Sequence, residues 1–470
     1  MGTKKTIIGL KDLDKRAYNI VCNWYKSIDF NPVYKGIDYS LIIRFYLWDK
    51  VGRALRIQNG IGNNEVDAYK EEYKNFPQYY TTLLPRGSYK RNLFSRKKII
   101  FIPYQSSLTQ GIVSKLHESK SAKVISKISG DILPQKRIIK LSPVKQDKEW
   151  SEVLYSNLIK ALNVSNINLI PEDVWLLKEQ IYGAVRLTNL AVAELKTNKP
   201  DAVYVHSDNH PPYINYVLAA KMLNIPTFTY QHGLDCEHYY YNDCFADYVA
   251  VWSAHRKNRY ILNSLTQPIS YKIVGNVFLN NLAIDKNKVS NTILYITRPH
   301  KPLKCYAPSR SHKEGLEILK VILKFLLKNK SIELIIKPHP MDIISFYTNA
   351  ISECKLQNRA RIKNTSINEL LSKSAIVITE DSTAGVEVMR FGIPLIHANF
   401  STVEPVLPLV KEKAALKGFN EDELLHSIEL AFNLDEYERA TLIEQQKQLS
   451  EKLIPKGNVK SVISYILENI

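Results

Sequence analysis

The chain has 470 residues, of which 45% are hydrophobic, and a formal net charge of +18 at pH 7. This length is sufficient for two or more hydrophobic cores, because single domains rarely exceed about 250–300 residues, and the composition excludes a disordered or fibrous protein. No apolar run approaches the roughly 18–20 residues that span a bilayer, and the N-terminus lacks the apolar segment of a signal peptide, so we expect a cytoplasmic protein.

The basic charge is compatible with several acidic partners. It attracts polyanions, anionic membrane surfaces and acidic substrates, but the sequence has no helix-turn-helix, zinc-finger or RNP signature, so we do not expect nucleic acid as a partner. One tight basic cluster with interleaved aromatic residues is a candidate for contact with an anionic membrane surface or an anionic acceptor, which would hold the protein peripherally at the inner face of the cell membrane. Its residues are Arg86, Tyr89, Lys90, Arg91, Phe94, Arg96, Lys97 and Lys98.

The first 95 residues are predicted to form a mostly helical extension. Residues 38–56 have a helical pattern, whereas 63–80 are polar and rich in tyrosine, without a strong period. From residue 97 the pattern changes to short β-branched runs that alternate with helical segments, which is typical of βαβ units and a parallel sheet.

This first α/β series predicts a Rossmann-like domain over residues 96–283. Two long helices interrupt it, at 149–162 and 171–196, and Pro171 suits the first turn of the second. The predicted strands are 98–103, 122–128, 202–205, 227–230, 247–252 and 272–274, and the other predicted helices are 108–118, 213–223 and 254–265.

A polar stretch at 283–291 is the candidate interdomain linker. A second α/β series then predicts a Rossmann-like domain over 284–455, and the final segment, 456–470, is predicted to be a helix that packs back on the N-terminal domain. The predicted strands are 293–297, 332–337, 360–362, 376–379 and 394–398, and the predicted helices are 313–329, 343–353, 367–372, one ending at 391, and 436–453. The sequence therefore predicts an α/β protein with two Rossmann-like domains facing each other across a cleft.

Six of the eleven histidines fall at or just beyond predicted strand ends. They are His206, His210, His232, His300, His339 and His397. A structural role remains open for any one of them, but core histidines have no reason to collect at strand ends. Ligands of open α/β sheets bind outside the carboxyl ends of the strands, so the group favours a functional site.

In the second series, two strands end in cations suited to phosphate. Arg298 follows the first, and its planar guanidinium can meet phosphate oxygens bidentately. Lys337 and His339 follow the next, with prolines on both sides of the histidine that restrict the backbone and therefore the reach of the imidazole.

A third strand of this series ends in an acid and two hydroxyl groups before a predicted helix. Free amides and hydroxyls at a helix N-terminus favour a phosphate or diphosphate, so Asp381, Ser382 and Thr383 are candidate donor-nucleotide ligands. Glu387 shares a helix face with Thr383 and could accept hydrogen bonds from ribose hydroxyls. Ordinary helix capping by Asp381 and Ser382, with Glu387 as a surface acid, is the structural alternative.

In the first series, the candidate acceptor-side residues follow two strands. His206, Asp208 and His210 come after the strand at 202–205. Gln231, His232 and Gly233 follow the strand at 227–230, and Gly233 allows a sharp turn. If a hydroxyl attacks the group attached to the phosphate, the general base would stand here, and either Asp208 or His232 could fill that role.

We expect neither a metal nor another cofactor. The five cysteines are scattered and odd in number, which argues against a disulfide framework. Cys236, His238 and Cys244 lie close in sequence, but they lack paired C-x-x-C spacing and a fourth ligand.

Taken together, Gln231-His232-Gly233, Lys337-Pro338-His339-Pro340 and the stretch 380–394 resemble the bacterial surface-polysaccharide transferases of the GT-B fold, over roughly residues 97–455. By motif the chain is most similar to the CDP-glycerol glycerophosphotransferases of teichoic-acid synthesis and to capsule polysaccharide glycosyltransferases that share their architecture. Bacterial sialyl- and Kdo-transferases also carry a K-x-H-P element followed by a hydroxyl motif.

The resemblance implies metal-independent transfer from a nucleotide-activated donor, CMP- or CDP-linked in the nearest families, to a surface glycan or lipid-linked acceptor. It implies that His339 lies against the donor phosphate, that Ser382 and Thr383 also bind phosphate, that Glu387 binds the ribose, and that His232 is a catalytic group on the acceptor side. The chain departs from these families at two points. The acidic element of the sialyltransferases is not evident, and Asp381 is followed directly by Ser382 where the teichoic-acid pattern has an aromatic residue, so the donor's identity stays open.

The predicted function is therefore an inverting glycosyltransferase or polyol-phosphate transferase. His232 or Asp208 would deprotonate the acceptor, while His339 and the other donor-side groups would stabilise the departing nucleotide phosphate. Two alternatives remain: a nucleotide-sugar 2-epimerase of the same fold, which needs no acceptor, and a non-catalytic basic binding module.

Overall fold

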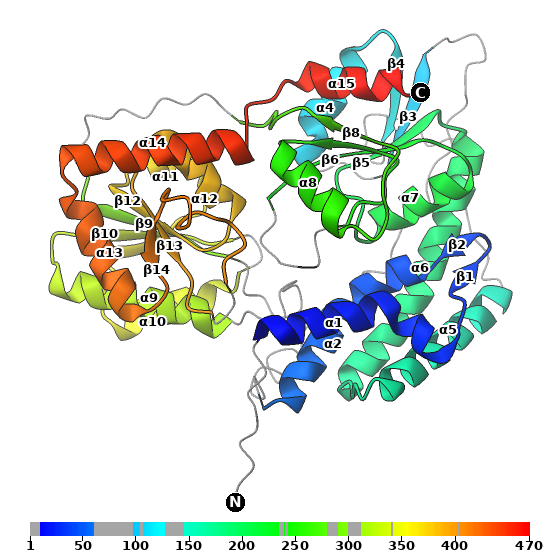
Figure 1. Cartoon of the computed structure of the whole chain (residues 1–470), viewed down its shortest axis with the longest axis horizontal. Helices are drawn as coiled ribbons and strands as arrows, with labels where there is room; N and C mark the ends of the chain where they lie inside the picture. The colour runs from blue at the N-terminus through cyan, green and yellow to red at the C-terminus, as the bar shows by residue number, and fades with distance from the viewer. Residues whose placement is uncertain are drawn as a thin grey trace, which may run out of the picture.

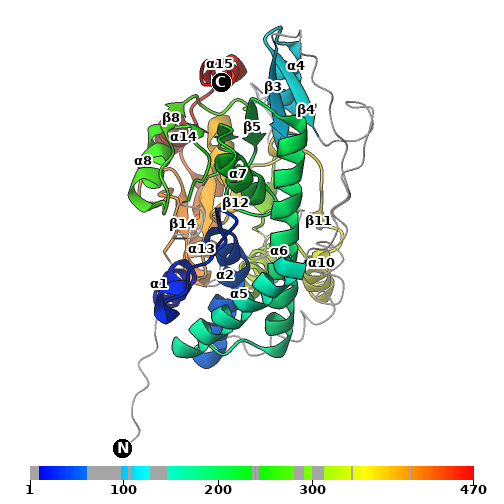
Figure 2. The same ribbon diagram turned by 90° about the vertical axis from the view of Figure 1, so that its right-hand side faces the viewer.

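The structure is a computed structural model that describes residues 10–60, 97–103, 107–126, 145–234, 239, 243–279, 290–298, 312–339, 342–401 and 404–470. Two parallel sheets of six strands each occupy separate lobes, and a layer of long helices lies beside the first lobe (Figures 1 and 2). The predicted fold class, an α/β protein with two Rossmann-like halves, is confirmed. The predicted domain boundaries stay predictions, and the linker at 283–291 falls almost entirely outside the described residues.

The first sheet has the strand order β4-β3-β5-β6-β7-β8, with every neighbouring pair parallel. Its strands are β3 (Lys98–Ile102), β4 (Ala122–Ser126), β5 (Ala202–Val205), β6 (Thr227–Tyr230), β7 (Tyr248–Val251) and β8 (Ser270–Ile273). The helices connecting them are α4 (Ser107–Glu118), α7 (Tyr213–Met222) and α8 (Ala254–Asn263). Every residue of β5 and β6 is buried, as expected for strands covered on both faces.

The second sheet has the order β11-β10-β9-β12-β13-β14, again all parallel. Its strands are β9 (Thr292–Ile296), β10 (Glu333–Lys337), β11 (Ala360–Ile362), β12 (Ile376–Thr379), β13 (Leu395–Ala398) and β14 (Leu416–Gly418). Its helices are α9 (His312–Lys328), α10 (Ile344–Glu353), α11 (Ile367–Leu371), α12 (Thr383–Val388) with the 3-10 turn η6 (Met389–Phe391), α13 (Glu421–Asn433) and α14 (Glu436–Leu453).

Both sheets reverse their strand order beside the first strand of the series. In the first sheet β4 lies on one side of β3 and β5 on the other, and in the second sheet β10 and β12 flank β9 in the same way. Such a reversal opens a crevice at the carboxyl ends of the strands, where ligands of this architecture bind. The reversal therefore fixes where a site should be sought in each half.

The N-terminal helices pack with two long helices that follow β4. They are α1 (Leu10–Asn23) and α2 (Ser40–Gln58), with the short strands β1 (Val33–Tyr34) and β2 (Ile37–Asp38) between them, and their partners are α5 (Lys145–Val164) and α6 (Pro171–Asn198). Arg53 of α2 makes two hydrogen bonds, of 2.9 and 3.1 Å, to the carboxylate of Asp173 in α6. These helices share one hydrophobic core with a face of the first sheet.

The chain crosses between the lobes twice, and the two crossings touch at a pair of glycines. Gly275 has φ +74°, and a Cβ placed there would lie 2.5 Å from the Cα of Gly457, so only glycine fits. Asn276 N donates to Pro455 O at 2.6 Å, which fixes the crossing. Beyond it, α15 (Val459–Glu468) packs beside α4 of the first lobe, and Tyr465 Oη donates to Ser270 O in β8 at 2.9 Å (Figure 1).

Candidate functional site

The two lobes meet where strand ends of both sheets come together. The backbone N–H of Leu234, in the turn after β6, donates a hydrogen bond of 2.9 Å to Oγ1 of Thr383, the first residue of α12. A Cβ added to Gly233 would lie 3.5 Å from the same oxygen, which is ordinary contact. The His232-Gly233 turn of the first lobe and the Ser382-Thr383 pair of the second lobe are therefore neighbours.

Ser382 and Thr383 stand at the start of α12, and the hydroxyl oxygen of each accepts a backbone hydrogen bond. Ser382 is the N-cap, and its Oγ accepts a 3.2 Å hydrogen bond from Ala384 N. Glu387 follows one turn later and is half-buried; burial raises the pKa of its carboxyl group, and the nearby charge of Arg390 opposes that rise. Ser382 thus has the capping role that the structural alternative describes, and Thr383 is the point of contact with the other lobe.

Asp381 is directed into the protein. Its side chain is 1% exposed, and its carboxylate accepts hydrogen bonds from Val406 N at 2.8 Å and Leu407 N at 3.2 Å. Nε2 of the equally buried His397 lies 3.2 Å from Oδ1. The carboxylate therefore fixes the segment that follows β13, and its predicted part in nucleotide binding stays a prediction.

The main chain of His339 is clamped by neighbours that sequence reasoning overlooked. His339 N donates to Thr297 Oγ1 at 2.9 Å and to Asp342 Oδ2 at 3.0 Å. Asp342 Oδ2 also accepts hydrogen bonds from the hydroxyls of Thr297 and Tyr347. An acid three residues after the histidine of the Lys337-Pro338-His339-Pro340 motif was the available signal for this clamp.

The other predicted cations of the second lobe lie at the ends of β9 and β10. Arg298 is only 7% exposed and follows Thr297 directly. Lys337 is half-buried, and its Nζ donates to Asn364 Oδ1 at 3.2 Å, on the β11 side of the sheet. His300 lies outside the described residues.

Three histidines and a tyrosine gather at the carboxyl ends of β5 and β6. The ring centroids of His206 and His232 are 5.8 Å apart, and those of His206 and His210 lie 4.2 and 5.1 Å from Tyr213. Burial, with the neighbouring histidines, lowers the pKa of His206 to about 3, and its Nδ1 is buried without a hydrogen-bond partner among the described residues. The structure thus brings the three predicted acceptor-side histidines together.

His232 is the exposed member of this group. The surrounding protein lowers the pKa of its ring, as do the charges of His210 and Arg256, while a hydrogen bond with the His206 backbone opposes the shift. Its imidazole is therefore neutral at pH 7 and can accept a proton. Gln231 shapes the turn that holds it, since Nε2 donates to Gly233 O at 2.9 Å and Oε1 accepts from Trp252 N at 2.8 Å.

Asp208 lies behind the histidines and is 4% exposed. It accepts hydrogen bonds from Phe245 N at 2.6 Å and Ala246 N at 2.8 Å. Burial raises the pKa of its carboxyl group, and these backbone donors, with the charge of Arg256, oppose that rise. Arg256, a further buried group that sequence reasoning missed, stacks over Tyr260 with its guanidinium carbon 4.0 Å from the ring centroid.

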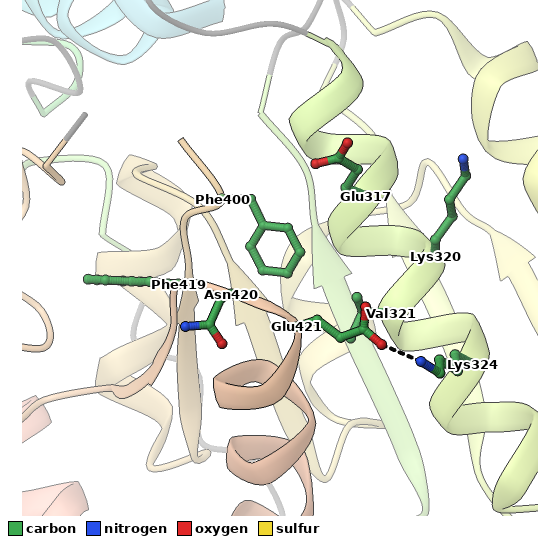
Figure 3. Close-up of a pocket in the computed structure, with 8 residues that line it drawn as sticks. All are labelled: Glu317, Lys320, Val321, Lys324, Phe400, Phe419, Asn420 and Glu421. Carbon is green, nitrogen blue, oxygen red and sulfur yellow. Dashed lines mark hydrogen bonds and ion pairs between the residues drawn. The ribbon is translucent and has the colours of Figure 1, made fainter. Parts of the chain in front are cut away.

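A pocket of about 420 Å³ lies in the second lobe, away from this group (Figure 3). It is formed by α9, the residue pair after β13 and the start of α13, and none of the predicted site residues lines it. Its lining residues are Glu317, Lys320, Val321, Lys324, Phe400, Phe419, Asn420 and Glu421. An ion pair between Lys324 and Glu421 closes one side. Phe419 contacts the ring of His397, with centroids 5.7 Å apart, so the pocket backs onto the buried Asp381.

Several predicted features lie outside the described part of the chain. Cys236 and His238 are among them, whereas Cys244 is buried, its pKa raised to about 12 by burial. Within the described ranges, no three His, Cys, Asp or Glu residues are grouped as metal ligands. Of the basic cluster at 86–98, only Lys97 and Lys98 are described. No helix in the described part is long and apolar enough to cross a membrane.

Comparison with known proteins gives structural matches alone. Neither the protein-family models nor the curated sequences match this chain. A protein from Listeria monocytogenes, described as a putative UDP-N-acetylglucosamine 2-epimerase, is 13% identical with a TM-score of 0.50, over 80% of this chain and 97% of its own. The UDP-GlcNAc 2-epimerase of Neisseria meningitidis bound to UDP-GlcNAc is 15% identical, with a TM-score of 0.49, over 79% of this chain and 100% of its own. An α,α-trehalose-phosphate synthase (UDP-forming) of Burkholderia vietnamiensis is 11% identical, with a TM-score of 0.48, over 80% of this chain and 100% of its own.

The chain has the GT-B fold. At 13% identity the similarity establishes the arrangement of the two α/β lobes and nothing finer. A closer relationship to the CDP-glycerol glycerophosphotransferases stays a prediction.

Proposed function

We propose that the protein transfers a glycosyl or polyol-phosphate group from a nucleotide-activated donor, CMP- or CDP-linked by motif, to a surface glycan or lipid-linked acceptor. One observation carries the proposal: the Leu234 N to Thr383 Oγ1 hydrogen bond, which makes the His232 turn a neighbour of the Ser382-Thr383 helix start. A transferase needs a proton acceptor on one side of the reacting carbon or phosphorus and charge stabilisation on the other. The contact between the lobes brings candidates for both roles together.

On the donor side, charge develops on the nucleotide phosphate as it departs. Arg298 follows β9, Lys337 is the last residue of the adjacent parallel strand β10 and His339 follows it, so the three residues lie at the same sheet edge. Cations and N–H donors held in advance of the reaction stabilise such charge without reorganisation. The clamp of Thr297 and Asp342 on His339 supplies that preorganisation.

On the acceptor side, His232 is the better candidate for the general base. It is exposed and neutral at pH 7, whereas Asp208 is buried with its carboxylate committed to two backbone amides. Direct attack by the deprotonated acceptor would invert the configuration at a sugar carbon. No metal is needed in this scheme, because the cations and helix start of the second lobe take the phosphate charge.

The first experiment identifies the nucleotide. In a thermal-shift assay with CMP, CDP, UDP, GDP and dTDP, we expect only the nucleotides of one base to raise the melting temperature of the protein. A ligand that binds only the folded state stabilises it by mass action. The matching activated donor should then be consumed only when a glycan or lipid-linked acceptor is added. Wild-type protein that binds none of the five nucleotides would refute the proposal.

A nucleotide-sugar 2-epimerase is the second candidate, because the similar Listeria monocytogenes protein is described as a UDP-N-acetylglucosamine 2-epimerase. An epimerase would convert its sugar nucleotide in the absence of any acceptor. NMR spectra of the sugar nucleotide incubated with the protein alone separate the two functions, because a new epimer appears only for an epimerase. Cytoplasmic location and access to a lipid-linked acceptor at the inner membrane face belong to the transferase proposal.

A further inference from the structure

An exposed apolar surface lies along the last helix and last strand of the first sheet. Within the segment 261–273, Leu262 is 80% exposed and Ile269 is 72% exposed. Ile261, Leu265 and Ile273 are each between 47% and 49% exposed. Soluble proteins seldom collect aliphatic side chains on their surface without a partner, so such a patch marks an interaction site.

These side chains belong to one surface because α8 and β8 pack together. Tyr260 of α8 and Tyr271 of β8 stack with ring centroids 6.2 Å apart, so Tyr271 faces the helix. Ile269 and Ile273 lie two residues to either side of Tyr271 and therefore share its face. Gln267 Nε2 joins the loop to the helix end through Tyr260 O, at 3.4 Å. β8 is the edge strand of its sheet and lies at the left-hand edge of the molecule, above α8, in Figure 2.

The segment 254–273 itself carries only basic formal charges, of which Arg256 is buried and Lys272 pairs with Glu468 of α15 at 3.4 Å. It contains no Asp or Glu, and its Lys and Arg residues are Arg256, Lys257, Arg259 and Lys272. Burial lowers the pKa of His255, and so do the positive charges of Arg259 and of Lys452 in α14. Lys257 and Arg259 are the half-buried cations that α8 brings to this surface.

We propose that this α8–β8 surface (Ile261, Leu262, Leu265, Ile269 and Ile273) docks the protein on an anionic lipid bilayer. Aliphatic side chains enter the boundary between headgroups and acyl chains, while adjacent cations attract anionic headgroups, and the two effects add. The net charge of +18 favours the same partner. A second copy of the chain fits less well, because pairing this surface with itself would bring like charges together.

This proposal goes beyond the proposed function, because docking needs neither donor nor acceptor. It also involves a different part of the chain from the basic cluster at 86–98. Vesicle flotation without nucleotide therefore tests docking by itself, and an inactive protein could still dock.

The test compares vesicles of phosphatidylcholine with vesicles that also contain phosphatidylglycerol. Wild-type protein should float with the anionic vesicles, and the double variant L262S/I269S should bind them at least about tenfold more weakly, because both side chains lose acyl-chain contact. Lys257→Glu should weaken binding about fivefold or more. The matched control is Leu327→Ser, which removes an equally apolar side chain, 52% exposed, from α9 of the other lobe. It should bind as wild type does.

Two results would overturn the proposal. One is undiminished flotation of L262S/I269S, with a melting temperature equal to that of wild type. The other is a wild-type dimer in light scattering that becomes monomeric in L262S/I269S, without vesicle binding by either protein, which would assign the surface to a second copy.

Discussion

Asp208 and Asp381 hold equivalent positions in the two lobes. Each follows the strand that lies beside the first strand of its sheet, on the far side of the crossover, β5 in one case and β12 in the other. Each carboxylate accepts two backbone hydrogen bonds from a later segment: Asp208 from Phe245 and Ala246, Asp381 from Val406 and Leu407. Each of these two predicted site residues therefore holds a later segment of the chain against its sheet.

This equivalence leads to a test of the general base. Asp208→Asn should lower the free energy of unfolding by about 1–3 kcal/mol, because an amide replaces an acceptor of two buried hydrogen bonds, and should retain most of the turnover of its folded fraction. His232→Gln should do the opposite, with turnover down about 10²-fold and a melting temperature near that of wild type, since the ring is exposed. Donor-consumption kinetics and urea unfolding measure both. Normal kinetics in His232→Gln, with loss of turnover in stable Asp208→Asn, would transfer the role to the carboxylate.

The second acid gives a related prediction. Asp381→Ala removes a 1% exposed carboxylate together with its contact to His397, and should cost about 3 kcal/mol of stability. Asp381→Asn keeps one acceptor oxygen and should cost less. Nucleotide affinity, measured by titration at a temperature where the variants are folded, should stay within a few-fold of wild type. A stable variant that no longer binds nucleotide would instead place this carboxylate in the donor site.

The sequence predicted most of the strands of the two sheets. Nearly every strand could be predicted because buried parallel strands read as short β-branched runs such as Ile376–Thr379. The exceptions are β1, β2 and β14, which have only two or three residues each and are too short to show a pattern. Helix α13 was also missed, although Asn420 and Glu423 carried a capping signal.

The site was harder to predict because spacing does not say where a side chain points. Sequence placed Asp208 and His232 at adjacent strand ends with equal claims to be the base. Only the fold shows that the backbone amides of residues 245 and 246 donate hydrogen bonds to the carboxylate of Asp208. Contacts between segments far apart in the chain, such as that of Leu234 with Thr383, cannot be predicted from the local sequence of either segment.

The contact between the lobes predicts a graded effect at Thr383. Thr383→Val keeps the shape of the side chain but removes the oxygen that accepts from Leu234 N, so turnover should fall about tenfold. Thr383→Ser retains the hydroxyl and should be close to wild type. Stability should change by about 1 kcal/mol or less, the scale of one ordinary hydrogen bond. Equal kinetics in the valine and serine variants would show that this contact has no part in the reaction.

Variants of His339 and of the residues that hold its backbone distinguish direct contact with the donor from positioning. His339→Ala should reduce turnover by about 10²-fold or more, the scale for loss of one charge-stabilising donor. Tyr347→Phe removes one hydrogen bond of 3.1 Å to Asp342 and should cost about 1 kcal/mol of stability with little loss of turnover. Asp342→Ala removes the acceptor for His339 N, Thr297 and Tyr347 together, so both stability and turnover should fall. Unchanged turnover in His339→Ala would remove that residue from the mechanism.

The lowered pKa values of the histidines at the ends of β5 and β6 predict a loss of stability in acid. The pKa values of His206, His210 and His232 are all lowered in the folded protein, that of His206 to about 3. Below the unfolded value of about 6.5 the unfolded chain binds protons that the folded protein does not, so stability must fall as the pH falls. Each such histidine contributes a slope of up to about 1.4 kcal/mol per pH unit until its folded pKa is reached.

The variant His206→Gln isolates one of these contributions. Urea unfolding at pH 7, 6 and 5 should show wild type losing stability more steeply than the variant, by up to about 1.4 kcal/mol per unit. The carboxylates titrate in both proteins and cancel in the difference. Parallel stability curves would mean that the His206 ring takes up protons equally in the folded and unfolded states, which its buried, unpartnered Nδ1 does not favour.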